Sequence, residues 1–201
     1  ISFYGAGNYA TATLIPLMKD SGKVSFNGLV TSTGMSAQSV AKKFDFNYCA
    51  SNYKEILNDK NDVVAITTRH DTHSKAICDA LAANKNVYVE KPLALSISEL
   101  EDINKAYTDN AKSQIMVGFN RRFAPSTNEI IQHFESVKSP LVINIRVNAG
   151  FIPADHWTQD AQEGGGRMIG EGCHFIDLAS AITKSNVKTI YAVGSSKEEK
   201  S

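Results

Sequence analysis

The sequence predicts an α/β protein whose first part is a doubly wound parallel sheet. Three observations predict it. Short apolar runs alternate with helical periodicity through residues 1–120, a glycine-rich turn follows the first run, and this alternation of strand and helix patterns ends after Asn120. Strands that alternate with helices require crossover connections, and such connections give a parallel sheet between helical layers. We therefore expect two regions, a nucleotide-binding sheet domain over 1–120 and the start of an α+β substrate domain over 121–201.

The expected elements of the first region follow from apolar spacing. Strands are expected at Ile1–Tyr4, Val24–Val30, Val63–Thr67, Asn86–Val89 and Gln114–Val117. Helices are expected at Tyr9–Lys19, Ser36–Phe44, Tyr53–Leu57, Ser74–Ala83 and Ser98–Tyr107. Pro16 lies inside the first of these helices, and because proline has no N–H it should kink the helix or weaken its last turn.

The second region has a different pattern. We expect a helix at Ser126–Val137, a long strand at Leu141–Ala149, a helix that opens after Gly164–Gly166 and a strand at Thr189–Val193. Two strands alone make a marginal sheet, so this domain is expected to be incomplete. The chain also opens inside an apolar run without Met, and we expect both ends to be cut from a longer protein.

Composition and charge argue against several functional classes. Lys plus Arg equals Asp plus Glu, 21 against 21, so no net field favours nucleic acid or an anionic membrane. No apolar run approaches the roughly 20 residues that span a bilayer. The three cysteines are far apart and the five histidines form no ligand spacing, which predicts neither a disulfide framework nor a metal site. We expect a soluble, cytoplasmic protein with a small-molecule ligand.

A glycine-rich turn predicts where that ligand binds. Gly5-Ala6-Gly7-Asn8-Tyr9-Ala10 follows a strand and opens a helix, which is the G-x-G-x-x-A pattern of a Rossmann-type dinucleotide site. Gly5 permits the tight turn and Gly7 lets the main chain approach a pyrophosphate, while the helix N-terminus faces the anion. Gly5, Ala6, Gly7, Asn8 and Tyr9 are therefore candidate cofactor contacts. A glycine turn without any ligand is the alternative.

The end of the second strand bears on the choice between NAD and NADP. An acid there grips the ribose 2′-hydroxyl of NAD, and an Arg pairs with the 2′-phosphate of NADP. The strand ends Val30-Thr31-Ser32-Thr33-Gly34 and offers neither. Thr31 and Ser32 are the candidate contacts, and the preference stays open.

The hexamer Val87-Tyr88-Val89-Glu90-Lys91-Pro92 is a strand that ends in an acid, a base and a constrained residue. Carboxyl ends of parallel strands face the ligand crevice, so Glu90 and Lys91 are expected where nicotinamide and substrate meet. Pro92 fixes the backbone and could adopt a cis bond that aims Lys91. A surface Glu-Lys pair that merely closes a strand is the alternative.

Together with two further motifs, these residues resemble a known family. The stretch Val117-Gly118-Phe119-Asn120-Arg121-Arg122-Phe123 and the run from Gly164-Gly165-Gly166 to His174-Phe175-Ile176-Asp177 complete a likeness to the glucose-fructose oxidoreductase and inositol dehydrogenase (Gfo/Idh/MocA) family. The likeness spans nearly the whole chain. It implies NAD(P)-dependent oxidation of a secondary alcohol on a sugar, polyol or nucleotide-linked sugar.

Within that family the chain is similar to the oxidoreductase module of bi-domain proteins. These carry an upstream part that resembles a zinc-type alcohol dehydrogenase and are associated with surface-polysaccharide synthesis. The resemblance also implies that the longer protein is a homo-oligomer, a dimer or a tetramer.

The resemblance assigns the catalytic roles. It puts Lys91 beside the reacting carbon as the group that relays the alcohol's proton, with Glu90 at the cofactor. It makes His174 and Asp177 a catalytic H-x-x-D pair, with Lys91 and His174 also facing the substrate. A core or capping histidine is the alternative reading of His174.

Two departures from the family pattern matter. Many polyol-oxidising members carry an Asp four residues before the histidine, where this chain has Gly170 with Glu171 beside it. Glu171 could replace that acid only if the helix start is displaced, because one residue turns a side chain about 100° around a helix. A complete Lys-Asp-His relay is therefore not expected.

The second departure follows the strand at Val63–Thr67. The family commonly has Pro-Asn before two variable residues and a His, and this chain has Arg69-His70 before Asp71-Thr72-His73. A position at a strand's carboxyl end still predicts cofactor contact, for which the candidates are Thr68, Arg69, His70 and His73. A solvated basic loop is the alternative.

The remaining candidates lie beyond the sheet. The resemblance puts Asn120 at the cofactor and Arg121 and Arg122 toward the substrate, and at least one of these arginines is expected to form a structural salt bridge instead. An arginine suits a carboxylate or phosphate because its donors form a planar fork. His156 and Trp157 could contact a sugar ring, although a Trp that anchors a loop is equally open.

Two other functions stay open. One is an NAD-dependent glycosidase of the same fold that oxidises its substrate transiently, and the other is a non-catalytic dinucleotide-binding module. The second is suggested by Gly170 and by the incomplete second domain. For residues 1–201 alone we expect cofactor affinity with little activity.

Overall fold

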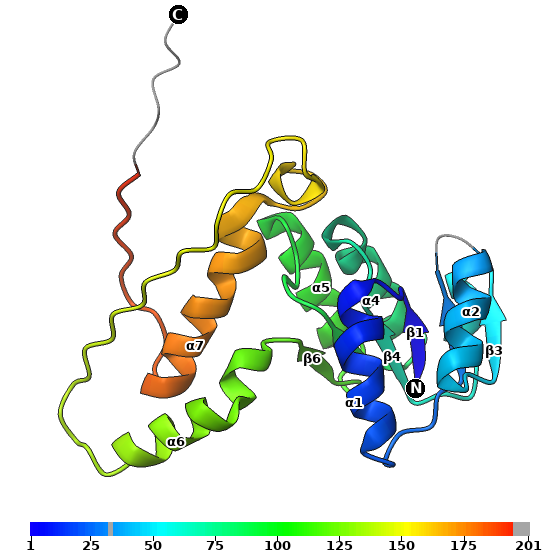
Figure 1. Cartoon of the computed structure of the whole chain (residues 1–201), viewed down its shortest axis with the longest axis horizontal. Coiled ribbons are helices and arrows are strands. Elements are labelled where there is room, and N and C mark those ends of the chain that lie inside the picture. The colour runs from blue at the N-terminus through cyan, green and yellow to red at the C-terminus, as the bar shows by residue number, and fades with distance from the viewer. Residues whose placement is uncertain (32–33, 195–201) are drawn as a thin grey trace, which may run out of the picture.

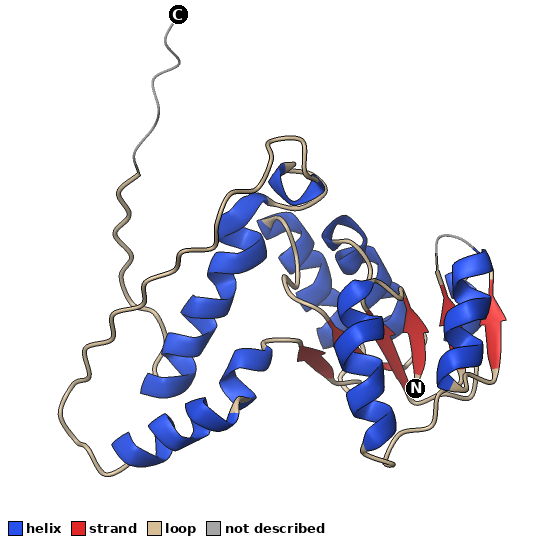
Figure 2. Cartoon of the chain, in the orientation of Figure 1, coloured by secondary structure: helices blue, strands red, loops and turns tan. Residues whose placement is uncertain are grey.

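The computed structural model describes residues 1–31 and 34–194, and a six-stranded parallel sheet organises the first part (Figure 2). The strands are β1 (Ser2–Tyr4), β2 (Gly28–Val30), β3 (Tyr48–Ala50), β4 (Val63–Ile66), β5 (Asn86–Val89) and β6 (Ile115–Val117). Their order is β3-β2-β1-β4-β5-β6, and every neighbouring pair is parallel. The chain therefore winds outward in both directions from β1 and β4, which confirms the predicted doubly wound class and creates a crevice where the winding reverses.

Helices cover both faces of this sheet. They are α1 (Ile15–Asp20), α2 (Gly34–Phe44), α3 (Tyr53–Leu57), α4 (His73–Ala82) and α5 (Ile97–Asp109). One buried cluster joins the sheet to α3, α4 and α5, and a second joins its other face to α1 and α2. The helices after the sheet are α6 (Pro125–Phe134) and α7 (Cys173–Thr183), which lie together to one side of it (Figure 1).

Alternation along the short strands explains these two clusters. On β4, Val64 and Ile66 belong to the cluster with α3, α4 and α5, whereas Ala65 between them belongs to the cluster with α1 and α2. All three are essentially inaccessible to solvent. A strand buried on both faces is continuously apolar, and this is why the short runs were recognisable in the sequence.

The helix after the glycine turn is irregular at its start. Residues Ala10–Leu14 form a π-helical turn, and Pro16 lies in the first turn of α1, which continues to Asp20. Of the two effects predicted for Pro16, a weakened last turn is absent, whereas the helix is irregular just before the proline. The proline ring crowds the carbonyl four residues earlier, and proline has no N–H to donate to that carbonyl.

The sequence interpretation missed β3 and overestimated β2. Tyr48–Ala50 pairs in parallel with Gly28–Val30, so only the last three residues of the expected strand Val24–Val30 find a partner. The other expected strands and helices of the first region are present with boundaries that differ by a few residues at most.

The two strands expected after Asn120 are absent. Neither Leu141–Ala149 nor Thr189–Val193 pairs with another segment among the described residues, and both run as irregular chain with Val142, Ile190 and Tyr191 exposed. These predictions were wrong because alternation of apolar residues indicates a strand only when a neighbouring strand satisfies its backbone groups.

The described residues also contain three short 3₁₀ turns, at His70–Thr72, Asn120–Phe123 and Trp157–Gln159, and a second π-helical turn at Met168–Gly172. Across 1–31 and 34–194 there is no helix with the length and apolar character needed to cross a bilayer.

Candidate active site

The glycine-rich turn lies where β1 meets β4. Gly5 has φ +103°, and a Cβ there would lie 2.7 Å from the carbonyl carbon and oxygen of Thr67. The Gly5 N–H donates to the carbonyl of Val30 at 2.8 Å, and the Thr67 hydroxyl donates to the carbonyl of Gly5 at 2.9 Å. Gly5 is thus required by the backbone packing of the turn.

Gly7 has a different reason to be glycine. A Cβ at Gly7 would meet nothing within 4 Å, so its neighbours in the fold do not exclude a side chain. The space in front of Gly7 belongs to a cavity at the carboxyl ends of the strands, and the helix that follows begins directly after it. A backbone left bare beside a helix N-terminus is what the close approach of a diphosphate requires.

The cavity has a volume of about 1440 Å³ and brings together most of the residues predicted from sequence. Those that line it are Gly5, Ala6, Gly7, Asn8, Tyr9, Thr31, Thr68, Arg69, His70, Glu90, Lys91, Asn120, Arg121, Trp157 and His174. His73, Arg122, His156 and Asp177 do not line it, and Ser32 lies outside the described residues. The motifs that are far apart in sequence therefore converge on one space.

Lys91 projects from the loop after β5, and its peptide bond to Pro92 is cis. The Lys91 ammonium donates to the carbonyl of Gly170 at 2.7 Å and to Glu171 Oε1 at 3.2 Å. Only 15% of the Lys91 side chain is exposed, against 48% for Glu171. The lysine thus joins the sheet region to the π-helical turn before α7.

Glu90 is held on the other side of the same loop. The Tyr88 hydroxyl donates to Glu90 Oε1 at 2.6 Å, and burial raises the pKa of the Glu90 carboxyl. A Cβ on Gly118 would lie 2.8 Å from Glu90 Oε1 and 2.9 Å from the Tyr88 hydroxyl. The glycine of the β6 motif thus makes room for this carboxyl at the cavity wall.

His174 lies near the start of α7 and is only 5% exposed, yet it lines the cavity. Its Nδ1 is buried without a hydrogen-bond partner among the described residues. Burial lowers the pKa of His174, and the positive charges of Lys91 and Arg121 lower it further. An imidazole that lines the cavity beside a lysine can exchange a proton or bind a hydroxyl group.

Arg122 and Asp177 form the structural salt bridge expected of one arginine. Arg122 Nε donates to Asp177 Oδ2 at 3.0 Å and Nη2 donates to Oδ1, a two-point pairing that raises the pKa of Arg122. Only 9% of the Asp177 side chain is exposed. This geometry ties α7 to the turn Asn120–Phe123 and gives Asp177 an anchoring position outside the cavity. Arg121 does line the cavity, with its guanidinium 4.9 Å from the Phe175 ring.

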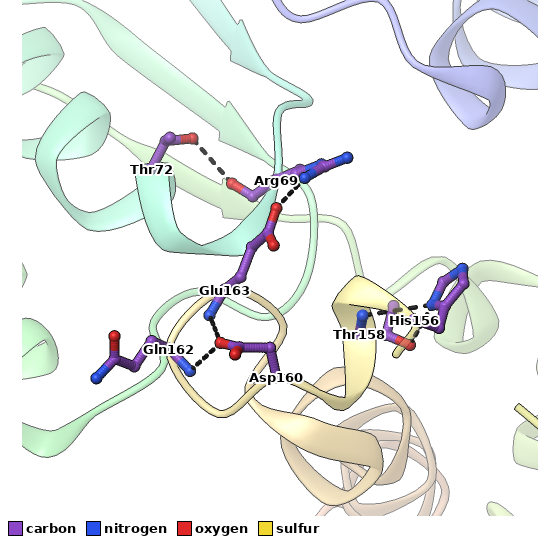
Figure 3. A network of polar contacts seen from close by, with 7 residues as sticks. All are labelled: Arg69, Thr72, His156, Thr158, Asp160, Gln162 and Glu163. Carbon is purple, nitrogen blue, oxygen red and sulfur yellow. Dashed lines mark hydrogen bonds and ion pairs between the residues drawn. The ribbon is translucent and has the colours of Figure 1, made fainter. Parts of the chain in front are cut away.

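Arg69 and His70 contact a loop from the second half of the chain, and Figure 3 shows Arg69 beside Glu163 of that loop. Arg69 pairs with Glu163, and its guanidinium lies 5.4 Å from the Trp157 ring. His70 Nδ1 lies 2.9 Å from the carbonyl of Gly164, and its ring meets the Trp157 ring edge-on at 4.9 Å. Trp157 is therefore occupied by protein contacts, which favours the loop-anchor interpretation.

The loop is stiffened by its own polar contacts. Asp160 Oδ1 accepts from the backbone N–H groups of Gln162 and Glu163, both at 2.8 Å (Figure 3). The His156 side chain contacts Thr158 and stays exposed. These bonds position Glu163 for its ion pair with Arg69. Arg69 and His70 therefore connect the loop after β4 to the second region of the chain.

His73 and Asn120 connect the strand-end loops. His73 is fully buried, with Nδ1 2.8 Å from the carbonyl of Pro92 and Nε2 3.2 Å from that of Thr68. Asn120 Nδ2 donates to the Tyr9 hydroxyl at 3.0 Å. His73 thereby supports the loop that carries Lys91, although it does not line the cavity.

Sequence reasoning missed the residues that enter the cavity with β3. Ser51, Asn52 and Tyr53 line it, and the Tyr53 ring stacks on Tyr4 with centroids 4.9 Å apart. Asn52 caps α3 together with Glu55, a reciprocal capping box that stands in the sequence as N-x-x-E. That signal marks the start of the expected helix and could have indicated a strand end before it.

The described residues hold no cluster of three or more His, Cys, Asp or Glu side chains arranged for a metal ion, and Cys49, Cys78 and Cys173 are free.

Comparison with known proteins bears on this site. The model of GFO_IDH_MocA, described as an oxidoreductase family with an NAD-binding Rossmann fold, matches residues 1–119. An inositol 2-dehydrogenase of Salmonella typhimurium is 32% identical over 144 residues, which are 70% of this chain and 41% of that protein. The chain thus spans less than half of the length of this relative.

Solved structures agree with the fold. An NAD-binding protein from Listeria innocua has a TM-score of 0.76 at 26% identity and covers 93% of this chain and 55% of that one. A levoglucosan dehydrogenase in complex with NADH and levoglucosan has a TM-score of 0.73 at 21% identity, with 90% of this chain and 53% of that chain covered.

Proposed function

The chain belongs to the GFO_IDH_MocA oxidoreductase family, with its NAD-binding Rossmann fold, and from this premise we propose that it binds a nicotinamide dinucleotide. In the full-length protein it would transfer a hydride between that cofactor and a secondary alcohol of a sugar, polyol or nucleotide-linked sugar. One observation carries the proposal: Lys91, whose side chain is 15% exposed, and the buried His174 line the same cavity as the open backbone of Gly7.

The residues present fit the cofactor. The diphosphate would lie against the Gly5–Tyr9 turn, whose Gly7 leaves open space before a helix N-terminus. Thr31, Thr68, Arg69, His70, Glu90, Lys91 and Asn120 are the other proposed contacts that line the cavity. Ser32 and His73, which we also predicted as contacts, lie outside the described residues and outside the lining, respectively. When bound, the nicotinamide supplies the site with a hydride acceptor or donor.

Both NAD and NADP remain in the proposal. Thr31 follows β2 where an acid would select NAD, and the nearby wall carries Ser51 and Asn52. Neutral hydroxyl and amide groups of this kind can hydrogen-bond a ribose hydroxyl or a phosphate. The family name and a structural relative in complex with NADH support the unphosphorylated form.

Proton handling falls to Lys91 and His174. Lys91 is the proposed general base in oxidation, because its amine lies in the cavity with little access to water. His174, which lines the same cavity, orients that hydroxyl or exchanges a proton with it through its imidazole ring. Arg121 is the remaining proposed substrate contact, while Arg122 and Asp177 would act by holding α7 in place.

The substrate class is supported by the relatives. One is named an inositol 2-dehydrogenase and a structural neighbour holds levoglucosan, so both have ring compounds rich in hydroxyl groups. We propose the same chemistry here, with residues 1–120 supplying the cofactor site and residues 121–201 the first part of a substrate domain. Cytoplasmic location, a homo-oligomeric parent protein and an upstream alcohol dehydrogenase-like part belong to this proposal as well.

The decisive experiment is a titration followed by a substrate survey. The full-length protein is titrated with NAD and NADP by equilibrium binding, and inositols, sugars and nucleotide-sugars are then tested for change in nicotinamide absorbance. Net reduction of the cofactor by a polyol or sugar is expected. Sugar cleavage with no net reduced product would instead indicate the glycosidase, and tight binding without any reaction would indicate a non-catalytic module.

A further inference from the structure

We propose that Glu171 is the outlet through which the substrate's proton leaves the site. The inference rests on the proposed function, in which Lys91 takes the proton of a secondary alcohol, and it adds a residue that acts through Lys91. Glu171 lines the cavity and lies within hydrogen-bond distance of the Lys91 ammonium.

The contacts of Lys91 leave one route for the proton. Among the described residues its Nζ has two acceptors, the carbonyl oxygen of Gly170 at 2.7 Å and Glu171 Oε1 at 3.2 Å. A carbonyl oxygen accepts a hydrogen bond but does not take up a proton near neutral pH, whereas a carboxylate is a base. Of the two acceptors, only Glu171 can receive the proton.

The exposed fractions of the two side chains also favour Glu171 as the group that releases the proton to water. The Lys91 side chain is 15% exposed and cannot readily discharge a proton into solvent, whereas Glu171 is 48% exposed and bridges the cavity to the surface. His174 and Glu90, which also line the cavity, are worse exits. His174 is 5% exposed with a buried Nδ1, and Glu90 is occupied by the Tyr88 hydroxyl.

The π-helical turn explains why residue 171 reaches this position. The Cys173 N–H bonds to the carbonyl of Met168, five residues back, so the turn holds one residue more than an α-helical turn. Such an insertion displaces the side chains that follow it around the axis, and it occurs often at functional sites. Gly170 therefore presents only its carbonyl to Lys91, and the carboxylate comes from Glu171.

In oxidation the carbinol C–H bond breaks, and the hydrogen leaves with both electrons for the oxidised nicotinamide. The Lys91 ammonium gives a proton to the Glu171 carboxylate, which releases it to water. The O–H electrons form the carbonyl bond while the alcohol's proton passes to the Lys91 amine, and the ammonium is restored. One alcohol and one oxidised nicotinamide nucleotide yield one ketone, one reduced nucleotide and one proton.

The test uses proton carriers in solution. The full-length wild-type protein, Glu171→Gln, Glu171→Asp and the control Glu135→Gln are assayed for alcohol oxidation at one pH with increasing imidazole. Glu135 is an exposed partner of Lys184 outside the cavity, so its variant removes a comparable carboxylate from the surface. Nucleotide affinity is measured for each protein by titration.

For Glu171→Gln we expect kcat to fall about tenfold or more. The KM and the nucleotide affinity should stay within about twofold, since the amide still accepts a hydrogen bond. Imidazole should restore kcat in this variant and leave wild type and Glu135→Gln unchanged. Glu171→Asp should retain more activity than Glu171→Gln, because it keeps a carboxylate.

Two results would overturn the proposed role of Glu171. One is a Glu171→Gln kcat within threefold of wild type, and the other is a loss of kcat that imidazole does not relieve. If Glu171→Gln does not bind the nucleotide, Glu171→Asp is used instead. A kcat of Glu171→Asp that is reduced and that imidazole does not raise would then overturn the proposed role of Glu171. Wild-type protein without turnover would overturn the proposed function itself, so the two failures are distinguishable.

Discussion

At the scale of single residues, Lys91 carries the most specific prediction. Replacing it with alanine should lower alcohol oxidation by about a hundredfold or more, because loss of a proton-transfer group usually has that effect. Nucleotide affinity should change much less, since the Gly5–Tyr9 turn is untouched. Steady-state rates and nucleotide titration of Lys91→Ala check this, beside Lys184→Ala, which removes an exposed lysine. Turnover within about threefold of wild type would remove Lys91 from the mechanism.

The two glycines of the turn should respond in opposite ways to one added methyl group. Gly5→Ala should destabilise the fold by roughly 2 to 4 kcal/mol, because its Cβ would overlap the Thr67 backbone at a φ of +103°. Gly7→Ala should leave stability almost unchanged, since its Cβ meets nothing, but should weaken nucleotide binding. Denaturant unfolding and titration of both variants measure the contrast. Equal nucleotide affinity of Gly7→Ala and wild type would show that the diphosphate lies elsewhere.

At the scale of elements, the Arg122–Asp177 pair predicts how α7 is held. Arg122→Met leaves a nearly buried carboxylate without its partner, and we expect a loss of about 1 to 2 kcal/mol in unfolding free energy. The expected loss of unfolding free energy is smaller than for a fully buried ion pair, because the Arg122 side chain is 40% exposed and water screens its charge. Adding Asp177→Leu should recover much of the loss, since it removes the unpaired charge. Thermal unfolding of both proteins measures it, and a double variant less stable than the single one would contradict the anchoring role.

The elements also show how far sequence reasoning reaches. Strands buried on both faces, such as β4, were predictable because their apolar runs are bounded by polar residues. β3 was not, since Tyr48-Cys49-Ala50 contains no β-branched residue, whereas the equally short β6 is Ile115-Met116-Val117. The opposite error at Leu141–Ala149 arose because alternation says nothing about whether a neighbouring strand exists.

The same limits apply to the candidate site. Gly5, Glu90 and Lys91 were identifiable because local motifs at strand ends fix where they lie. The pairing of Asp177 with Arg122 outside the cavity could not be predicted from a helical wheel. The position of Glu171 relative to His174 could not be predicted either, because the π-helical turn Met168–Gly172 lies between them and no local sequence pattern predicts that turn.

At the scale of the whole molecule, buried histidines make the fold sensitive to acid. Burial lowers the pKa of His70, His73 and His174 from an ordinary value of 6.5. Below that value the unfolded chain takes up protons that the folded chain refuses, so stability is complete above pH 6.5 and falls as pH drops toward the lowered pKa values. Unfolding free energies from about pH 7 to about pH 5.5 should decline. His73→Asn should flatten the slope, whereas His156→Asn, at an exposed site, should leave it unchanged.

The two regions of the chain are joined through a loop, and this contact predicts a whole-molecule response. Trp157 packs against Arg69 and His70, so it fastens residues 154–172 to the loop after β4. Trp157→Ala should raise hydrogen exchange in 154–172 by tenfold or so while the strands of the sheet keep their protection, because loops open independently of the core. Phe151→Ala is the matched control, since that ring is 90% exposed. Because Glu171 lies within the released segment, the Trp157 variant should also weaken the hold on Lys91 and lower kcat. Faster exchange with full activity would mean that the loop closes the cavity without positioning the proton-transfer groups.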